Sequence, residues 1–250
     1  MVHRVGILAF DGMTLLDAAG PAEVFSEADN GRHCYDVRMV ALGAGSVRTS
    51  SGVRIEADAV TDGTGFDTFL VPGFEGPPAR DPALVAAVRA LSEASGRVAS
   101  VCTGSFLLAE AGLLEGRAAT THWRYADLMR RTYPAVDVQS DAIFVRAGKV
   151  FTSAGVSAGI DLALALVEDD HGADAARDVA RSWSCSCSAR EHIHSSPEGW
   201  NYPSCLVGRF VQYLMLLSVI PPATTPCRQW PAEPRSRRGT LPACSGRSWA

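Results

Sequence analysis

Short apolar segments alternate with amphipathic segments between residues 3 and 181 of the chain. The apolar segments are rich in Val, Ile, Leu and Phe, which predicts strands that are buried on both faces. Strands separated by helices indicate a mainly parallel sheet that helices cover on both sides, and we therefore predict an α/β fold. The predicted strands are Arg4–Phe10, Asp36–Leu42, Phe66–Val71, Arg97–Val101 and Ala118–Trp123.

The segments between these strands predict helices and two hairpins. Asp81–Ser95 has Pro82 in its first turn and a single apolar face, as expected of a helix that packs on a sheet. Pro21 lies within the first helical segment and is expected to start or interrupt that helix. The predicted helices are Leu15–Ala28, Asp81–Ser95, Gly104–Leu114, Tyr125–Tyr133 and Ser157–Val167, and the predicted hairpins are Val47–Ala57 and Val136–Thr152.

The pattern ends at Ser182, so we predict one domain over residues 1–181 and an irregular tail over residues 182–250. The last part of the tail is rich in proline and arginine, which predicts disorder. Trp183–Ser188 can be encoded so that a shifted reading frame gives Val-Val-Phe-Leu-Gln, an ordinary buried run. We favour the hypothesis that the tail is an out-of-frame translation, and a divergent linker is the alternative.

Composition and charge exclude several classes of partner. The chain has 250 residues, of which 47% are hydrophobic, and a formal net charge of −4. This balance gives no electrostatic basis for binding nucleic acid or a membrane surface, and the apolar run Leu206–Ile220 is short for a membrane span. The first residues do not resemble a signal peptide, so a cytoplasmic location is expected. The seven cysteines include no Cys-x-x-Cys pair, so neither a disulfide framework nor a metal site is expected, and no cofactor is predicted.

Cys102 is the first candidate for chemistry, because it follows a predicted strand and precedes a predicted helix. The small residues Gly104 and Ser105 permit a tight turn that would present the thiol, as in a nucleophile elbow. We expect the positive end of the following helix to lower the pKa of the thiol and so to raise its nucleophilicity. A buried structural cysteine that acts as a small hydrophobe is the alternative.

Other candidate side chains follow neighbouring predicted strands, where ligands gather in parallel sheets. Asp17 lies in an apolar stretch and is expected to have a raised pKa that suits an acid or base, unless it caps a helix. Gly73 ends a strand, and its N–H together with that of Thr103 would form an oxyanion hole facing Cys102. His122 is either a base or hydrogen-bonding group of a pocket, or a core histidine.

Four longer segments carry a resemblance to a known family. They are LLDAAGPAEVF, FLVPG, SVCTGSFLLAEAGLLEGRAATTHW and FTSAGVSAGIDLALALVEDDHG. On these segments, residues 3–181 resemble the DJ-1/PfpI (class I glutamine amidotransferase-like) superfamily. The resemblance implies a flavodoxin-like, doubly wound sheet with a nucleophile elbow. Within the superfamily the chain is most similar to the amino-terminal domain of GlxA-type regulators of the AraC family and to isonitrile hydratase, which hydrates R–NC to an N-substituted formamide.

The resemblance to isonitrile hydratase implies roles for individual residues. In that enzyme the elbow cysteine attacks the isonitrile carbon, supported by an aspartate after the first strand and a threonine after the cysteine. The matching residues here are Cys102, Asp17 and Thr103. Thr103 stands where the peptidase-like branches have a histidine, which argues against a peptidase. Phe74 stands where the family often has a second glycine, so the second oxyanion donor is expected to be blocked or reoriented.

Three functions remain open on this resemblance. We favour the small-molecule-sensing part of a GlxA-type regulator, cut from its DNA-binding domain, so that this chain itself binds no nucleic acid. The alternative is a cysteine-dependent hydratase or hydrolase in which Cys102 is the nucleophile and Asp17 the acid or base. A redox- or aldehyde-responsive protein is the third possibility. In each case Gly73, Phe74 and His122 are the predicted substrate- or ligand-binding residues, and the family implies a homodimer.

Overall fold

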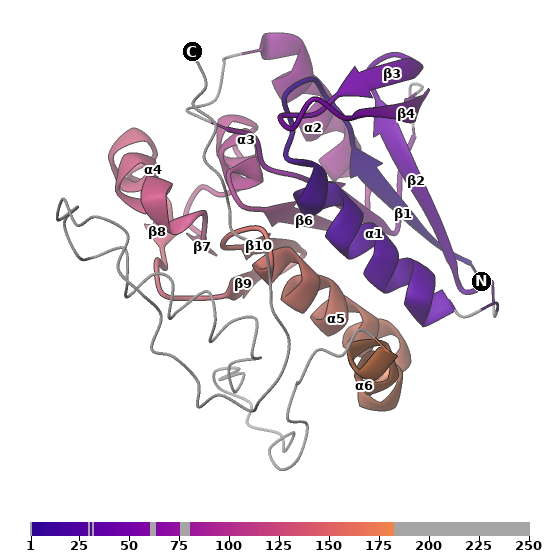
Figure 1. Ribbon diagram of the computed structural model, residues 1–250. Helices are drawn as coiled ribbons and strands as arrows, with labels where there is room; N and C mark the ends of the chain where they lie inside the picture. The colour runs from indigo at the N-terminus through magenta and orange to yellow at the C-terminus, as the bar shows by residue number, and fades with distance from the viewer. Residues whose placement is uncertain (1, 30, 32, 61–63, 76–80, 183–250) are drawn as a thin grey trace, which may run out of the picture.

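The computed structural model describes residues 2–182 except 30, 32, 61–63 and 76–80. The described chain folds around an eight-stranded sheet with the strand order β3-β4-β2-β1-β5-β6-β10-β9 (Figure 1). A short two-stranded sheet of β7 and β8 lies beside it. The strands are β1 (His3–Leu8), β2 (Tyr35–Ala41), β3 (Gly45–Arg48), β4 (Arg54–Ala59), β5 (Thr68–Val71), β6 (Arg97–Val101), β7 (Ala118–Ala119), β8 (Asp137–Val138), β9 (Phe144–Ala147) and β10 (Val150–Ser153).

The central strands are parallel, as the apolar runs predict. β1 pairs in parallel with β2 and β5, β5 with β6, and β6 with β10. At the two edges β3 is antiparallel to β4 and β9 is antiparallel to β10, so both predicted hairpins are present. The carboxyl ends of β1, β5 and β6 therefore lie at one edge of the sheet, and the segments that follow them meet there.

Helices cover both faces of the sheet. One apolar core joins the sheet to α1, α5 and α6 through residues such as Phe25, Leu162 and Val179, and a second joins it to α2, α3 and α4 through others such as Val88 and Phe106. The doubly wound, flavodoxin-like arrangement predicted above is thus confirmed. The helices are α1 (Leu15–Asp29), α2 (Pro82–Ala94), α3 (Gly104–Glu110), α4 (Ala126–Thr132), α5 (Ala158–His171) and α6 (Ala173–Ser182), with a 3₁₀ turn over Trp123–Tyr125.

Several predicted boundaries were wrong for local reasons. α3 ends at Glu110, before the predicted Leu114, because Gly112 adopts φ 76° and the N–H of Leu113 returns to the carbonyl of Leu108 at 2.9 Å. This is a glycine-terminated helix end in which a 6→1 bond satisfies a free carbonyl. Pro21 lies inside α1 and neither starts nor interrupts it.

Three further elements differ from the prediction. The predicted strand Ala118–Trp123 is reduced to β7, because the chain turns into the 3₁₀ segment. α5 continues to His171, beyond the predicted end at Val167, and α6 was not predicted because it is rich in charged residues. The predictions made for the tail, including its disorder, lie outside the described residues. Within the described part of the chain, no helix is both long and apolar enough to cross a membrane.

Candidate functional site

Cys102 occupies a strained turn between β6 and α3. Its φ of 58° is in the left-handed region, which is uncommon for a residue with a side chain and occurs at nucleophile elbows. The N–H of Cys102 donates to the carbonyl of Ser153 at 3.1 Å. Its own carbonyl accepts from the hydroxyl of Ser105 at 3.1 Å and from that of Thr121 at 3.2 Å. The structure therefore places the thiol on an elbow, as the sequence predicts.

Asp17 lies beneath the elbow in the first turn of α1. Its side chain is completely buried, and Oδ2 accepts the N–H of Gly73 at 3.1 Å. Oδ1 has no hydrogen-bond partner within the described part of the chain. The alternative of a helix cap is wrong, because α1 begins at Leu15 and the carboxylate faces Gly73. A buried carboxylate with a free oxygen is costly in a folded protein, and such groups gather at functional sites.

The carboxyl of Asp17 and the thiol of Cys102 interact, and burial disfavours the charged form of both. Burial raises the pKa of Asp17 to about 7, against the opposing hydrogen bonds from the Gly73 N–H and from Cys102. Burial, and then the charge of Asp17, raise the pKa of the Cys102 thiol to about 12. The hydrogen bonds of Thr103 and of the Val156 backbone lower it, but by less. Near neutral pH the thiol keeps its proton, and Asp17 is close to half-protonated.

The expectation of a lowered thiol pKa was wrong. α3 does begin just after Cys102, but the thiol is only 6% exposed and lies beside a carboxylate. Loss of hydration and a neighbouring negative charge both destabilise a thiolate. They outweigh the favourable field of a helix as short as α3, which falls off within its first turn.

Gly73 is packed tightly between the two groups. A Cβ atom at this position would lie 2.6 Å from Oδ2 of Asp17, 2.8 Å from Cβ of Cys102 and 2.9 Å from the nitrogen of Thr103. Only glycine fits such a close approach. The predicted oxyanion pair is changed, however, because the Gly73 N–H is engaged by Asp17. The backbone N–H groups that interact with the Cys102 sulfur are those of Thr103 and Val156.

Thr103 ties the loop after β5 to the elbow. Its hydroxyl accepts the N–H of Phe74 at 2.8 Å and donates to the carbonyl of Phe74 at 2.7 Å. Phe74 also bridges to Met13, and its ring lies edge-on to that of Phe10 with centroids 6.0 Å apart. Thr103 is therefore a link between two loops as well as a neighbour of the thiol.

His122 belongs to the adjoining loop. It is half-buried, and its Nδ1 accepts the N–H of Arg124 at 3.2 Å. Burial, followed by the charge of Arg124, lowers the pKa of this histidine. A Cβ atom on Gly155 would lie 3.2 Å from its ring, so His122 packs against the segment that carries Val156. Its place is beside the site, and within the described part of the chain it forms no hydrogen bond with Cys102 or Asp17.

Three further residues that contact Cys102 were not predicted from the sequence. Val156 follows β10, and only the fold brings its N–H to the thiol. Ser105 and Thr121 hold the carbonyl of Cys102. The signal for Thr121 was its position near the end of the predicted strand Ala118–Trp123, but nothing distinguished it there from Thr120.

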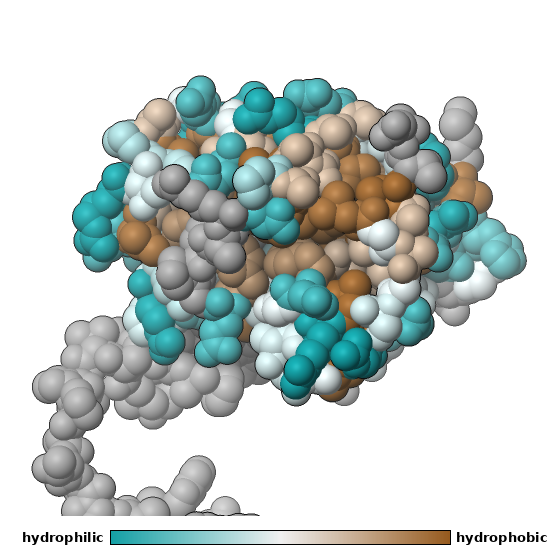
Figure 2. Space-filling model, turned by 90° about the horizontal axis from the view of Figure 1, so that it is seen from above, coloured by the Kyte–Doolittle hydropathy of each residue, from teal (hydrophilic) through white to brown (hydrophobic). Residues whose placement is uncertain are grey.

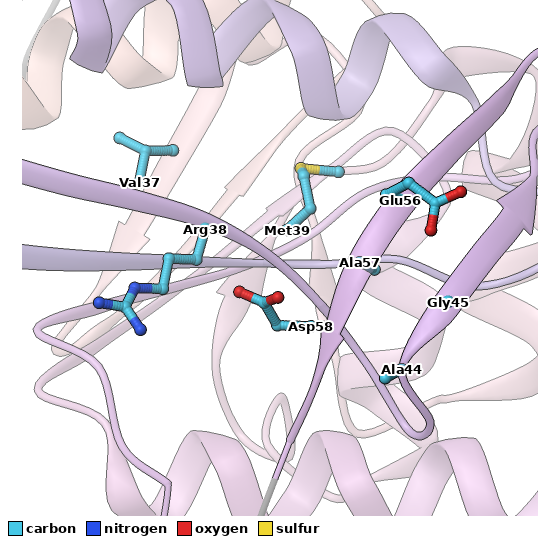
Figure 3. A pocket seen from close by; sticks show the side chains of 8 residues that line it. All are labelled: Val37, Arg38, Met39, Ala44, Gly45, Glu56, Ala57 and Asp58. Carbon is cyan, nitrogen blue, oxygen red and sulfur yellow. The ribbon is translucent and has the colours of Figure 1, made fainter.

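Other features of the described chain do not enlarge this site. Its His, Cys, Asp and Glu side chains include no group of three or more that could hold a metal ion. A groove of about 450 Å³ lies between β2 and β4, lined by Arg38, Met39, Glu56 and Asp58 among others (Figure 3). Its lining includes none of the residues around Cys102.

Residues 3–169 match the DJ-1/PfpI family. The chain belongs to this family. Its relatives include an enzyme and transcriptional regulators. Isonitrile hydratase of Pseudomonas putida is 35% identical over 72% of this chain and 77% of its own length. The HTH-type transcriptional regulator GlxA of Rhizobium meliloti (strain 1021) is 32% identical over 72% of this chain but only 56% of its own.

Solved structures support the DJ-1/PfpI fold. An AraC family transcriptional regulator from Pseudomonas putida superposes with a TM-score of 0.66, covering 72% of this chain and 99% of the other, at 17% identity. At that identity the likeness concerns the fold alone. The chain is thus a DJ-1/PfpI domain related both to GlxA-type regulators and to isonitrile hydratase.

Proposed function

We propose that this DJ-1/PfpI domain, residues 1–181, is the small-molecule-sensing part of a GlxA-type transcriptional regulator. The observation that carries the proposal is the enclosed pair of Cys102 and Asp17, in which the thiol keeps its proton near neutral pH. A thiol whose pKa is raised to about 12 is almost entirely protonated near neutral pH, and the protonated thiol is a poor nucleophile. A protonated thiol beside a half-protonated carboxyl suits reversible binding of a small polar ligand, because the thiol stays intact and the carboxyl can donate or accept a hydrogen bond.

The relatives support this proposal from another side. The regulator GlxA matches over only 56% of its own length, so the matched part is one portion of a longer protein. In this proposal the remainder, a DNA-binding domain, is encoded beyond codon 182 in a shifted frame. In this proposal residues 1–181 bind the small molecule, and the domain encoded in the shifted frame binds DNA.

The test of this proposal is the nucleotide sequence of the locus. We expect the shifted frame after codon 182 to stay open and to encode a helix-turn-helix segment. Stop codons within a few dozen codons in both other frames would contradict the regulator proposal. A frame-restored protein should bind DNA from its own upstream region in a mobility-shift assay, and the present chain should not.

A second candidate is hydration of an isonitrile, favoured by the contact between Asp17 and Cys102 and by the free Oδ1 of Asp17. In this reaction the carboxylic acid of Asp17 protonates the isonitrile carbon while the Cys102 sulfur bonds to that carbon, and the thiol proton returns to Asp17. The product is the thioimidate R–N=CH–S. Water adds across its C=N bond, and the adduct R–NH–CH(OH)–S collapses to R–NH–CHO and the free thiol.

One assay separates the two candidates. The protein is incubated with a simple isonitrile such as tert-butyl isocyanide, and formamide is measured by mass spectrometry. Formamide from the wild type, lost in Cys102→Ala and retained in the matched control Cys34→Ala, would support the hydratase. Full turnover by Cys102→Ala would exclude the covalent mechanism. No turnover by a protein whose melting temperature the isonitrile raises would favour sensing.

We also propose that the domain forms a homodimer through exposed apolar side chains around Leu16 and Val53. Apolar side chains do reach the surface of the domain, as the view from above shows between polar margins (Figure 2). Among the described residues the most exposed large apolar side chains include Leu16 and Val53, at 50% and 48%. The loops that precede them are joined by the hydrogen bond from the Ser50 N–H to the Met13 carbonyl at 2.9 Å. Light scattering should give twice the chain mass, and Leu16→Glu should reduce it to one.

A further inference from the structure

The peptide group between Cys102 and Thr103 has its two polar ends in different surroundings. Its carbonyl oxygen accepts from the hydroxyls of Ser105 and Thr121 at 3.1 Å and 3.2 Å. Its N–H, which belongs to Thr103, interacts with the sulfur of Cys102. Because a trans peptide is planar, its C=O and N–H point in opposite directions. Whatever holds the oxygen therefore also aims the N–H.

This peptide group needs to be held. Cys102 is in the left-handed region, which is unfavourable for a residue with a side chain. Rotation of the peptide plane would relieve that strain and would turn the Thr103 N–H away from the sulfur. It would also remove the carbonyl acceptor of the buried Ser105 and Thr121 hydroxyls, and a buried hydroxyl that loses its acceptor is destabilising.

The two hydroxyls are not equivalent. Ser105 lies in α3 and bonds to the carbonyl three residues before it, so this contact is local and moves with the elbow. Thr121 comes from the segment after β7, nineteen residues along the chain, and links the elbow to a separate part of the fold. Thr121 is therefore the brace that is independent of the elbow itself.

We propose that Thr121 is a positioning residue for Cys102: by holding the Cys102 carbonyl, it keeps the Thr103 N–H directed at the sulfur. The same N–H would face negative charge that develops on the sulfur or on a bound group. The inference rests on the Cys102 site being functional, whichever of the two proposed functions applies, and it requires neither a ligand nor turnover.

The chain provides a matched control. Thr120 adjoins Thr121 and is equally buried, but its hydroxyl donates to the carbonyl of Ala142 at 3.3 Å. Thr→Val removes a hydroxyl at nearly constant shape in both cases. Thr121→Val should therefore alter the thiol, whereas Thr120→Val should not. Thr121→Ser keeps the hydroxyl and should restore the wild-type behaviour.

The experiment measures the rate at which iodoacetamide alkylates Cys102 in the full chain, followed by mass spectrometry of the Cys102 peptide against pH. We expect Thr121→Val to react about 5–10-fold more slowly than the wild type, because a lost N–H contact raises the thiol pKa. Thr120→Val and Thr121→Ser should stay within about 2-fold. Ser105→Ala is the second variant and should also react more slowly.

For a folded Thr121→Val variant, two outcomes would overturn the proposal. In the first, Thr121→Val and Thr120→Val alkylate at the same rate. In the second, Thr121→Val reacts faster and its amide hydrogen exchange over residues 98–108 is faster as well, which would show that the hydroxyl only keeps the elbow closed. If Thr121→Val does not fold, Thr121→Ala also removes the hydroxyl and takes its place, and an unchanged rate in that variant would overturn the proposal. None of these readouts depends on the ligand or on isonitrile turnover, so a failure here is distinct from a failure of either proposed function.

Discussion

The two ends of the central sheet differ in whether their buried polar groups have partners. At the amino end, Arg97 and Asp170 form a two-pronged ion pair with N···O distances of 2.8 Å and 2.5 Å. The hydroxyl of Tyr35 donates to Asp170 at 2.8 Å, and Thr68 contacts both Arg97 at 2.6 Å and His3 at 2.7 Å. The charges at this end are paired, and their side chains are largely buried.

At the carboxyl end the same elements hold groups that are left unsatisfied. β6 starts at Arg97 and leads into Cys102, while α5 starts next to the loop of Val156 and runs to Asp170. Here the backbone is strained, Oδ1 of Asp17 is unpartnered among the described residues, and the pKa values of two neighbouring groups are raised. The charges of one end are paired, whereas the other end holds strained and unpartnered groups in an unfavourable state.

The largest expected effect concerns the pH dependence that Asp17 imposes. Its pKa is about 7 in the folded chain against an ordinary value of 3.8. Between about pH 4 and pH 7 the unfolded chain gives up this proton while the folded chain keeps it, so stability falls as pH rises, by on the order of 4 kcal/mol, and is then level. Asp17→Asn should lack this loss and should exceed the wild type in unfolding free energy at about pH 8.

The measurement is urea unfolding of the two proteins across this pH range, read as the difference between them. Asp141→Asn, which changes an exposed carboxylate, serves as the control. A difference between wild type and Asp17→Asn that does not change with pH would show that the carboxylate is not held in a costly state. With that result, the carboxyl end of the sheet would no longer differ from the amino end in holding a destabilising group.

The opposite end should respond to loss of its carboxylate. Asp170→Ala leaves the charge of Arg97 and the hydroxyl of Tyr35 without their main partner, and we expect the unfolding free energy to fall by about 3 kcal/mol. The adjacent Asp169 pairs with Arg146 at the surface, so Asp169→Ala should cost less than about 1 kcal/mol. Chemical unfolding measures both.

The same variants test whether the two ends are independent. We expect alkylation of Cys102 in Asp170→Ala to stay within about 2-fold of the wild type under conditions where the variant is folded. A large change would mean that β6 or α5 transmits strain along its length, and the division of the sheet into a stabilising and a functional end would then fail.

The sequence predicts which residues meet at the carboxyl end of the sheet, but not their pKa values. Asp17, Gly73 and Cys102 each follow an apolar strand, and parallel strands bring such positions to one edge of the sheet. Their meeting was therefore predictable. The sign of the thiol pKa shift was not, because it depends on how completely the elbow is buried and on Asp17 lying against it.

The amino end gave almost no sequence signal. Arg97 and Asp170 are 73 positions apart, and each stands at the end of an element where a charged residue is ordinary. Hydrophobic periodicity reports which faces are apolar, but it does not report which charges are paired across the fold. The partner of the Gly73 N–H could not be predicted for a similar reason. A glycine after a strand is expected both where its N–H binds an oxyanion and where its N–H binds a carboxylate such as Asp17, so the sequence does not distinguish the two cases.

The smallest expected effect is at His3, and it has the opposite sign to that of Asp17. Burial lowers the pKa of His3 in the folded chain from an ordinary value of 6.5, despite the nearby charge of Asp170. The stabilising contribution of His3 is therefore fully present above about pH 6.5 and is lost as the pH falls, because the unfolded chain takes up the proton first.

His3→Gln, which can still bond to Thr68, should not show this loss. Unfolding in an Asp17→Asn background removes the opposing slope, and there the advantage of the wild type over His3→Gln should shrink as the pH falls from about 7 to about 5. An advantage that grows on acidification would mean that Asp170 outweighs burial, so that the amino end would gain stability from acid and the two ends would no longer differ in sign.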